Sequence, residues 1–449
     1  MSVSTAFRSS LRTETAPPWW LPPSILTLAI AAALLLAPYP PLQDFAEWVY
    51  HGAMLAQLAV GLPGATVSLA THPVPNSLAQ AVLGLLALVL PATLAARVFL
   101  LGLLGASLAV ALALGRQRQP AAAGAFAGVL LVSILCNATF WNGYVNYQLA
   151  LVIFAAWFLL PPARRAATGP ILGFGLAIFL SHAAVFTAFC MVVGFRALLR
   201  RQWRGATLGL GPLLLLGAWY VLGRSGEAAD PPPAYDSAGA FLAYKAYTLA
   251  KLGPYHNFVF AQGGDEVLRP ALYWAGAAVN LLYVAGLGAA LGYGLWRGLR
   301  SRALSAPLIV ASLALFVGFL LLPRMGQHVI NPGERLMLPG LLVLLLAVPL
   351  PPFALRGLAT LGGLALTANL LVFTLPNDTW AVPVHFDDMA AMGSARAMFR
   401  HRPTSFACKW EELRHSDATG APPRLPISFR TSLLETSAAP YQCPVPAGP

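Results

Sequence analysis

Residues 92–118 read ATLAARVFLLGLLGASLAVALALGRQR, an apolar run that ends in the basic segment 115–118 (GRQR). An α-helix needs about 20 apolar residues to cross the hydrocarbon layer of a bilayer, and the part of the run before Gly115 has that length. Arginine and lysine gather on the cytoplasmic side of transmembrane helices. Residues 92–114 therefore predict a transmembrane helix that ends in the cytoplasm.

Composition places the whole chain in the same class. Of its 449 residues, 58% are hydrophobic and 10% are charged, which excludes a soluble globular protein. The net charge of +12 comes mainly from arginines between apolar runs. That arrangement is typical of cytoplasmic loops that face anionic lipid, and not of nucleic-acid binding. We therefore expect an all-α, polytopic helical membrane protein of a cell inner membrane, with membrane lipid and no nucleic acid among its partners.

Arginine placement predicts about 11 spans, with the N-terminus inside and the C-terminus outside. The stretch 170–199 is basic at both ends, so we expect it to enter the membrane and return, with the turn at Ser181-His182. Residues 75–91 are short for a span, and we expect a re-entrant or interfacial helix there, with a full crossing as the alternative. The expected spans are residues 21–38, 92–114, 122–137, 146–161, the two halves of 170–199, 206–223, 271–296, 304–323, 336–353 and 357–375.

Two parts follow from this topology. Residues 1–375 form a transmembrane helical domain, which includes a large extracytoplasmic segment after the first span. Residues 376–449 form an extracytoplasmic tail, small and partly irregular, whose Pro-rich sequence predicts little packing. The tail contains Cys408 and Cys443, which are able to form a disulfide in an oxidising compartment, but two cysteines alone leave their pairing open.

Ionisable side chains concentrate in the segment 40–52 (PPLQDFAEWVYHG), directly after the first expected span. If this segment is helical, Asp44, Glu47 and His51 fall on one stripe of the helix. Ionisable groups at membrane depth are costly, so such a cluster indicates a functional site. The alternative is structural, because Asp44 and Glu47 have the spacing of a capping box with Asp44 as the N-cap. One residue is able to serve both purposes.

Further polar side chains fall on the same, extracytoplasmic side. Asn142 and Asn146 either cap the next span or bind a sugar, and His182 is either a hydrogen-bonded structural histidine or part of a site. His51 and His72 lie near Glu47 in the sequence, but the spacing matches no zinc signature, so we expect no metal cofactor, with a divalent metal as the less favoured alternative. The candidate site residues on this side are Asp44, Glu47, His51, Asn142, Asn146, His182, Arg324, His328 and Arg335.

Arg335 stands at the start of an expected span, at its outer end. A cation is disfavoured at a helix N-terminus, where the helix dipole is positive. The position makes sense if an anion such as a phosphate lies between the guanidinium and the free N–H groups of the first turn. The alternatives are that Glu334 or Asp44 neutralises the arginine, or that its side chain reaches to the interface.

The chain resembles the GT-C superfamily of integral-membrane glycosyltransferases in two features. These are the first outer acid, in the segment 41–45 (PLQDF), and the arginine that ends the segment 332–335 (PGER). The stretch 140–146 (FWNGYVN) is similar to that of a bacterial multispanning branch with the same general plan. The resemblance implies a GT-C-like domain over residues 1–375. It further implies transfer of a sugar from a polyprenyl-phosphate donor to a glycan, lipid or protein acceptor at the periplasmic face.

The resemblance also implies roles for single residues. Asp44 would be the general base, and Arg335, with Arg324 or His328, would stabilise the departing lipid phosphate. Glu47 and His51 would orient Asp44 or contact sugar hydroxyls. Many members carry a second acid beside the first, whereas here Phe45 follows, which argues against the metal-dependent subclass. A transporter or lipid flippase, or a non-catalytic membrane assembly protein, is the alternative, although the polar residues gather at one surface rather than near the midplane.

Overall fold

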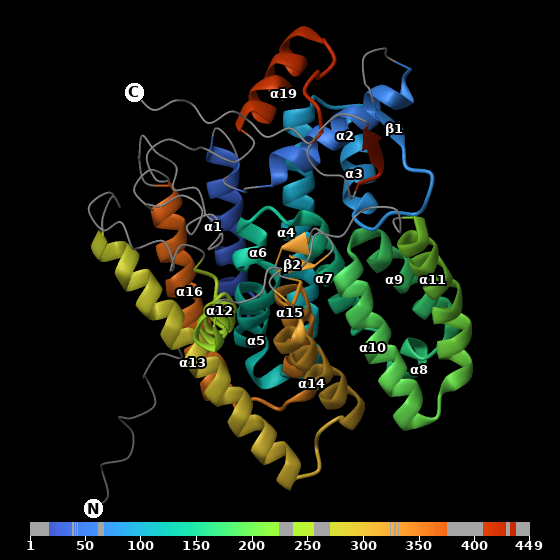
Figure 1. Ribbon diagram of the computed structural model, residues 1–449. Helices are drawn as coiled ribbons and strands as arrows, with labels where there is room; N and C mark the ends of the chain where they lie inside the picture. Colours follow the sequence, from blue (N-terminus) through green and yellow to red (C-terminus); the bar gives the residue numbers. More distant parts are fainter. Residues whose placement is uncertain are drawn as a thin grey trace, which may run out of the picture.

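The computed structural model describes residues 18–37, 40, 42, 44–61, 67–223, 237–255, 270–323, 325–326, 329–330, 332–374, 407–427 and 432–436. Within these residues the chain is all-α apart from two small antiparallel sheets (Figure 1). The all-α prediction is confirmed. The main helices are α1 Leu21–Leu36, α2 Phe45–Ala59, α3 Ser77–Ala87, α4 Ala92–Arg118, α5 Ala123–Leu130, α6 Ala138–Trp141, α7 Val145–Trp157, α8 Pro162–Arg165, α9 Thr168–Ser181, α10 Ala183–Arg200, α11 Trp203–Gly223, α12 Ala238–Ala250, α13 Pro270–Arg300, α14 Ala306–Leu321, α15 Glu334–Ala347, α16 Pro352–Thr374 and α19 Ala407–Thr419.

Five of these helices are long and apolar enough to cross a membrane, namely α4, α10, α11, α13 and α16. Shorter apolar helices include α1, α7, α9 and α14, and α5 continues through the π-helical turn η2, Leu131–Leu135. Each stretch that the sequence analysis expects to span is helical in the structure. This content of long apolar helices is that of a multi-pass membrane protein.

The helices form three neighbouring groups (Figure 1). α13 and α16 pack along each other at one flank, and α9, α10 and α11 pack together at the opposite flank. Between them lie α4, α5, α7, α14 and α15. The largest fully buried side chains include Trp141, Tyr147, Phe154 and Trp157, so the densest part of the core is the central group around α6 and α7.

The expected turn within 170–199 is present. α9 ends at Ser181 and α10 begins at Ala183, while His182 between them has extended backbone with φ −165°. The imidazole Nδ1 of His182 accepts a hydrogen bond from the Ala184 N–H at 3.2 Å. His182 therefore caps α10, and this cap fixes the direction of its ring.

The segment 75–91 contains only the 11-residue helix α3. A helix of this length measures about 16 Å at 1.5 Å per residue, roughly half of the hydrocarbon thickness. α3 packs on α2, where a Cβ on Gly52 would lie only 2.6 Å from the Leu83 Cβ. The helix is thus a buried partner of α2.

The described part of the tail packs closely, which the Pro-rich sequence does not predict. α19 lies on α2 and α4, and strand β4 (Leu434–Thr436) pairs with β1 (Val67–Leu69). Trp410 and Leu413 of α19 are buried. Asp417 of α19 caps the start of α4, because its carboxylate accepts hydrogen bonds from the N–H groups of Ala92 and Thr93, at 2.7 and 3.0 Å.

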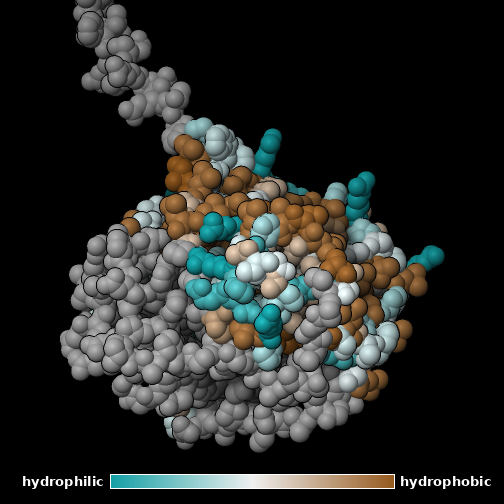
Figure 2. Space-filling model, turned by 90° about the horizontal axis from the view of Figure 1, so that it is seen from above, coloured by the Kyte–Doolittle hydropathy of each residue, from teal (hydrophilic) through white to brown (hydrophobic). Residues whose placement is uncertain are grey.

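α19 gives one end of the molecule a polar surface. Figure 2 shows hydrophilic side chains gathered on this end, with hydrophobic side chains around them. Cys408 of α19 is disulfide-bonded, whereas Cys136 and Cys190 are free thiols. Cys443 lies outside the described residues.

Candidate functional site

The site begins where the turn between α6 and α7 touches the start of α2. The Asp44 N–H donates to the Asn142 carbonyl oxygen at 3.0 Å. Gly143, the next residue, has φ +77°, and a Cβ there would lie 2.6 Å from the backbone nitrogens of both Asp44 and Phe45. Only glycine fits both the conformation and the close approach. This glycine therefore joins two segments that lie about 100 residues apart in the sequence.

Tyr144 links this turn to the start of α15. The Arg335 Cζ lies 4.8 Å from the centroid of the Tyr144 ring, a cation–π contact. One turn further along α7, the Tyr147 hydroxyl donates to the Arg335 carbonyl oxygen at 3.1 Å. The Arg335 Nη1 lies 3.0 Å from the Nε2 of His182. Residues from α2, α7, the α9–α10 junction and α15 thus meet in one place.

The charges of Asp44 and Arg335 both affect the pKa of the Tyr144 hydroxyl. Burial raises the pKa of Tyr144 above its ordinary value, the negative charge of Asp44 raises it further, and the positive charge of Arg335 opposes the rise. Glu334 and Lys251 act on the same hydroxyl with opposite signs. Asp44 and Arg335, which the sequence analysis places in one site, therefore lie within electrostatic range of a single phenol.

The contact between His182 and Arg335 leaves a donor without an acceptor. Burial and the Arg335 charge lower the pKa of His182 well below its ordinary value, so the imidazole is neutral at neutral pH. The Ala184 N–H points to its Nδ1 at 3.2 Å, and the Arg335 Nη1 lies 3.0 Å from its Nε2. A neutral imidazole has an acceptor lone pair on only one of its two nitrogens, so one of these two donors lacks an acceptor. An anion beside the pair would accept from the Arg335 guanidinium and, in the tautomer protonated on Nε2, from the ring N–H as well.

Glu334 does not neutralise Arg335. The Lys251 Nζ lies 3.0 Å from the Glu334 Oε2, and both side chains are 5% exposed. Burial alone would lower the pKa of Lys251, but the Glu334 carboxylate raises it above its ordinary value, so Lys251 is protonated at neutral pH. Within the described part of the chain, no acidic side chain forms a salt bridge with Arg335, and the guanidinium Nε has no hydrogen-bond partner.

The two asparagines of the 140–146 stretch are buried, each 2% exposed. Neither caps α7, which begins at Val145 with Tyr144 as its N-cap residue. Among the residues that the structure describes, the Asn146 amide has a hydrogen-bond partner on neither its oxygen nor its nitrogen. Buried amides are nearly always hydrogen-bonded in proteins, so this amide is suited to a water or a polar ligand. The structure thus removes the capping alternative for Asn146.

Glu47 and His51 lie in a different environment from the one expected. The His51 Nε2 is 3.0 Å from the Glu47 Oε1, and the Lys409 Nζ of α19 is 3.4 Å from the Glu47 Oε2, with all three side chains fully buried. Lys409 also lies 4.1 Å above the Tyr50 ring and donates to the Pro426 carbonyl. The cluster joins the tail to α2, so contact with sugar hydroxyls would require α19 to move.

The capping box, which the sequence left open as the structural alternative, does not form. Asp44 stands at the N-cap position of α2, but its side chain makes no capping hydrogen bond. Glu47, the N3 residue, turns to His51 and Lys409 instead of the start of the helix. Pairing with the Lys409 ammonium and the His51 imidazole replaces the capping role, because a fully buried carboxylate needs a compensating charge.

Other predicted residues lie elsewhere or outside the described ranges. Arg324 and His328 are outside the described residues. His72 lies 3.7 Å from the Glu435 carboxylate and against the Tyr220 ring, away from His51. Among the residues that the structure describes, no three or more His, Cys, Asp or Glu side chains gather in a way that would hold a metal ion.

Sequence reasoning missed Lys251 and Lys409. A signal was present in the composition, because the chain has only three lysines among many arginines. All three are buried and each has specific partners. The third, Lys245, donates to the carbonyls of Phe319 and Leu322 at the end of α14, at 2.6 and 3.0 Å. In an arginine-rich chain, the rare lysines therefore marked long-range contacts.

Comparisons with protein-family models, with curated proteins and with solved structures find no match for this chain. The candidate site lies where the start of α2, α7, the α9–α10 junction and the start of α15 meet. Its parts are a carboxyl at the start of α2, a guanidinium at the start of α15, a neutral imidazole beside that guanidinium, and, on α7, a buried amide that has no hydrogen-bond partner in the described part of the chain.

Proposed function

We propose that this chain is a GT-C-type membrane glycosyltransferase. It moves a sugar from a polyprenyl-phosphate donor to a glycan, lipid or protein acceptor at the periplasmic face of a bacterial inner membrane. The observation that carries the proposal is the convergence of Asp44 and Arg335 on Tyr144, at one end of a set of apolar helices. A base for the acceptor and a cation for the leaving phosphate are the two groups that this reaction needs.

The proposed topology has 11 spans, with the N-terminus inside, the tail outside and α3 not crossing. The disulfide bond of Cys408 supports it, because disulfides persist in oxidising compartments such as the periplasm. α19 packs on α2, so the side of the membrane that holds the tail also holds Asp44. The arginines at the ends of α4, α8 and α10 lie toward the opposite end, where cytoplasmic loops are expected (Figure 1).

Arg335 and His182 are suited to bind the donor phosphate. Among the described residues no acidic side chain pairs with Arg335, which lies beside His182 and stands in the first turn of α15, whose free backbone N–H groups also favour an anion. The long-chain donor reaches the site laterally from the bilayer, so a phosphate site at the boundary of the apolar helices fits a lipid-linked substrate. Asn146 would offer its buried amide to a sugar hydroxyl.

Asp44 acts as the general base in this proposal. It takes the proton from the acceptor hydroxyl as that oxygen attacks the anomeric carbon. The bond between the anomeric carbon and the phosphate oxygen breaks, and polyprenyl phosphate leaves with the electron pair. Arg335 stabilises the charge that grows on the phosphate, with Arg324 or His328 as further candidates. Attack opposite the phosphate inverts the anomeric centre, and the base contributes roughly 10²–10⁴ in rate.

The test measures transfer of labelled sugar from polyprenyl phosphate in membranes that contain the protein. Asp44→Asn should lower transfer at least about 10²-fold while donor binding is retained. Arg335→Ala should weaken donor binding as well. Glu411→Gln on the exposed face of α19 and Arg356→Ala at the exposed start of α16 are matched controls that should retain activity. Full activity in both site variants would refute the assignment, and lipid movement across the membrane without any sugar transfer would favour a flippase.

A further inference from the structure

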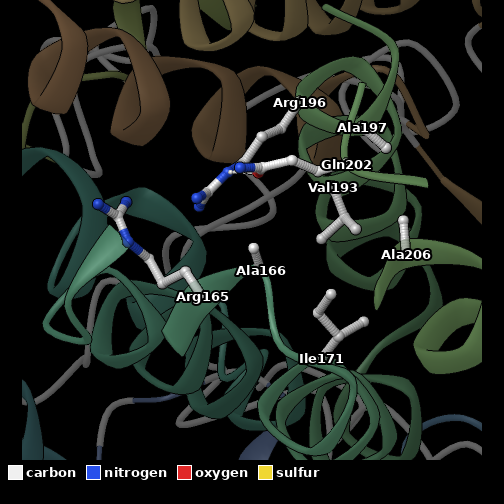
Figure 3. A pocket seen from close by; sticks show the side chains of 8 residues that line it. All are labelled: Arg165, Ala166, Ile171, Val193, Arg196, Ala197, Gln202 and Ala206. Carbon is white, nitrogen blue, oxygen red and sulfur yellow. Dashed lines mark hydrogen bonds between the residues drawn. The ribbon is translucent and has the colours of Figure 1, made fainter. Parts of the chain in front are cut away.

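A second polar site lies at the other end of the molecule from α19. A pocket opens between α8, α9, α10 and α11 (Figure 3). Figure 3 shows the guanidinium groups of Arg165 and Arg196 near each other on one side of this pocket, with apolar side chains on the other side. The pocket is lined by Arg165, Ala166, Ile171, Val193, Arg196, Ala197, Gln202 and Ala206.

Arg165 is a buried cation. Its side chain is 8% exposed, and its Nε has no hydrogen-bond partner within the described ranges. The guanidinium lies over the rings of Trp157 and Phe158, with its Cζ 5.8 and 5.6 Å from their centroids. Burial and the neighbouring arginines, including Arg196, lower the pKa of Arg165 to about 10, so it stays protonated at neutral pH.

The neighbouring arginines are oriented but not neutralised. The Arg196 Nε donates to the Gln202 Oε1 at 3.3 Å, and its Nη2 donates to the Pro162 carbonyl. The Arg118 Nη2 donates to the Phe158 carbonyl at 3.3 Å. In the part of the chain that the structure describes, no carboxylate forms a salt bridge with any of these arginines. Buried like charges repel one another, so an anion bound from outside the chain would stabilise the arginine cluster.

We propose that this pocket binds the phosphate group of an anionic phospholipid from the cytoplasmic leaflet. Arginine suits phosphate because its planar group donates two parallel hydrogen bonds. Basic pockets between helices on the cytoplasmic side are suited to anionic headgroups. Exposed apolar side chains surround the site, including Trp203 at the start of α11 and Leu172 and Leu208 on α9 and α11, and they would contact acyl chains. The site is separate from the proposed transferase centre and does not depend on it.

Native mass spectrometry and thermal unfolding of the detergent-purified chain test the site. The probes are phosphatidylglycerol, phosphatidylcholine and inorganic phosphate, each added to delipidated protein. Phosphatidylglycerol should be retained and should raise the melting temperature, whereas phosphatidylcholine should do neither. If inorganic phosphate alone gives the full rise in melting temperature, this result would support the same phosphate site, filled from solution. No shift from either anion would overturn the proposal.

Two variants and a control separate a lipid site from a structural role. Arg165→Gln should weaken phosphatidylglycerol binding at least about tenfold, since it removes a charge-assisted contact. The same variant should raise the melting temperature of the lipid-free protein, because it relieves repulsion; a purely structural arginine would lower it. Arg196→Gln, half-buried at the pocket, provides the binding test if the first variant does not fold. Arg204→Gln, exposed outside the pocket, should bind as the wild type does. Unchanged binding in both pocket variants would refute the site.

Discussion

Gly143→Ala perturbs the contact on which the candidate site depends. Gly143 has φ +77°, and an added Cβ would lie 2.6 Å from the backbone nitrogens of Asp44 and Phe45. Backbone atoms cannot move aside as a flexible side chain can. The turn would therefore separate from the start of α2, and the 3.0 Å hydrogen bond from the Asp44 N–H to the Asn142 carbonyl would be lost.

The size of the effect follows from three contributions. A non-glycine residue in the left-handed region costs about 1–2 kcal/mol. Loss of a backbone hydrogen bond costs about 0.5–1.5 kcal/mol. Crowding in a packed region costs about 1–3 kcal/mol. The free energy of unfolding should fall by roughly 2.5–6.5 kcal/mol in all. Gly61→Ala is the matched control, because Gly61 has φ +71° and nothing within 4 Å of the added Cβ, so it should lose only about 1–2 kcal/mol.

Unfolding of the two variants in mixed detergent–SDS micelles measures this difference. Sugar transfer gives a second readout, because Asp44 would shift relative to Tyr144 and Arg335 in Gly143→Ala only, and a misplacement of about 1 Å costs roughly 10²-fold in rate. Equal destabilisation of the two variants would refute the close approach. Wild-type transfer by Gly143→Ala would show that the position of Asp44 does not matter to the reaction.

Three further predictions concern buried ionisable side chains. Lys251→Met should lower the free energy of unfolding by about 3–5 kcal/mol, because it leaves Glu334 unpaired. The double variant Lys251→Met, Glu334→Leu should recover most of that loss in the same unfolding assay. Additive losses of the two single variants would contradict a direct pair. Lys409→Met should release α19 from α2, so limited proteolysis should cut near residue 419 faster than in the wild type, and equal protection would argue against this contact. His182 is neutral when folded but binds a proton near pH 6.5 when unfolded, so the melting temperature should fall as pH drops below about 6.5. His182→Asn keeps an acceptor for the Ala184 N–H and should flatten that pH dependence, whereas an unchanged slope would assign it to other groups.

Local features of the fold were predictable from the sequence. Apolar length and arginine placement located the helices, and the basic flanks of 170–199 located the break at His182. The start of α15 was also predictable, since Pro332-Gly333 directly precedes a polar pair and a long apolar run. These features depend on neighbours within a few residues or on the bilayer itself, so a single sequence carries them.

Long-range pairing was not predictable. The spacing of Asp44 and Glu47 fits a capping box, but the Glu47 carboxylate forms a salt bridge with Lys409 of the tail and does not cap the helix. Glu334 stands beside Arg335 in the sequence, yet its partner is Lys251 from the end of α12. The periodicity of one segment contains no information about which distant cation will meet it. The close packing of α19 was missed for the same reason.

The central claim is that the Arg335 guanidinium and the Asp44 carboxyl serve one substrate at the outer boundary of the membrane. A cryo-EM structure of Asp44→Asn in a lipid nanodisc with a polyprenyl-phosphate sugar tests it most directly. The phosphate should lie within hydrogen-bond distance of the Arg335 guanidinium and the His182 Nε2, with the sugar between them and residue 44. Lipid phosphate bound elsewhere, with the contact between Arg335 and His182 unchanged, would contradict the claim.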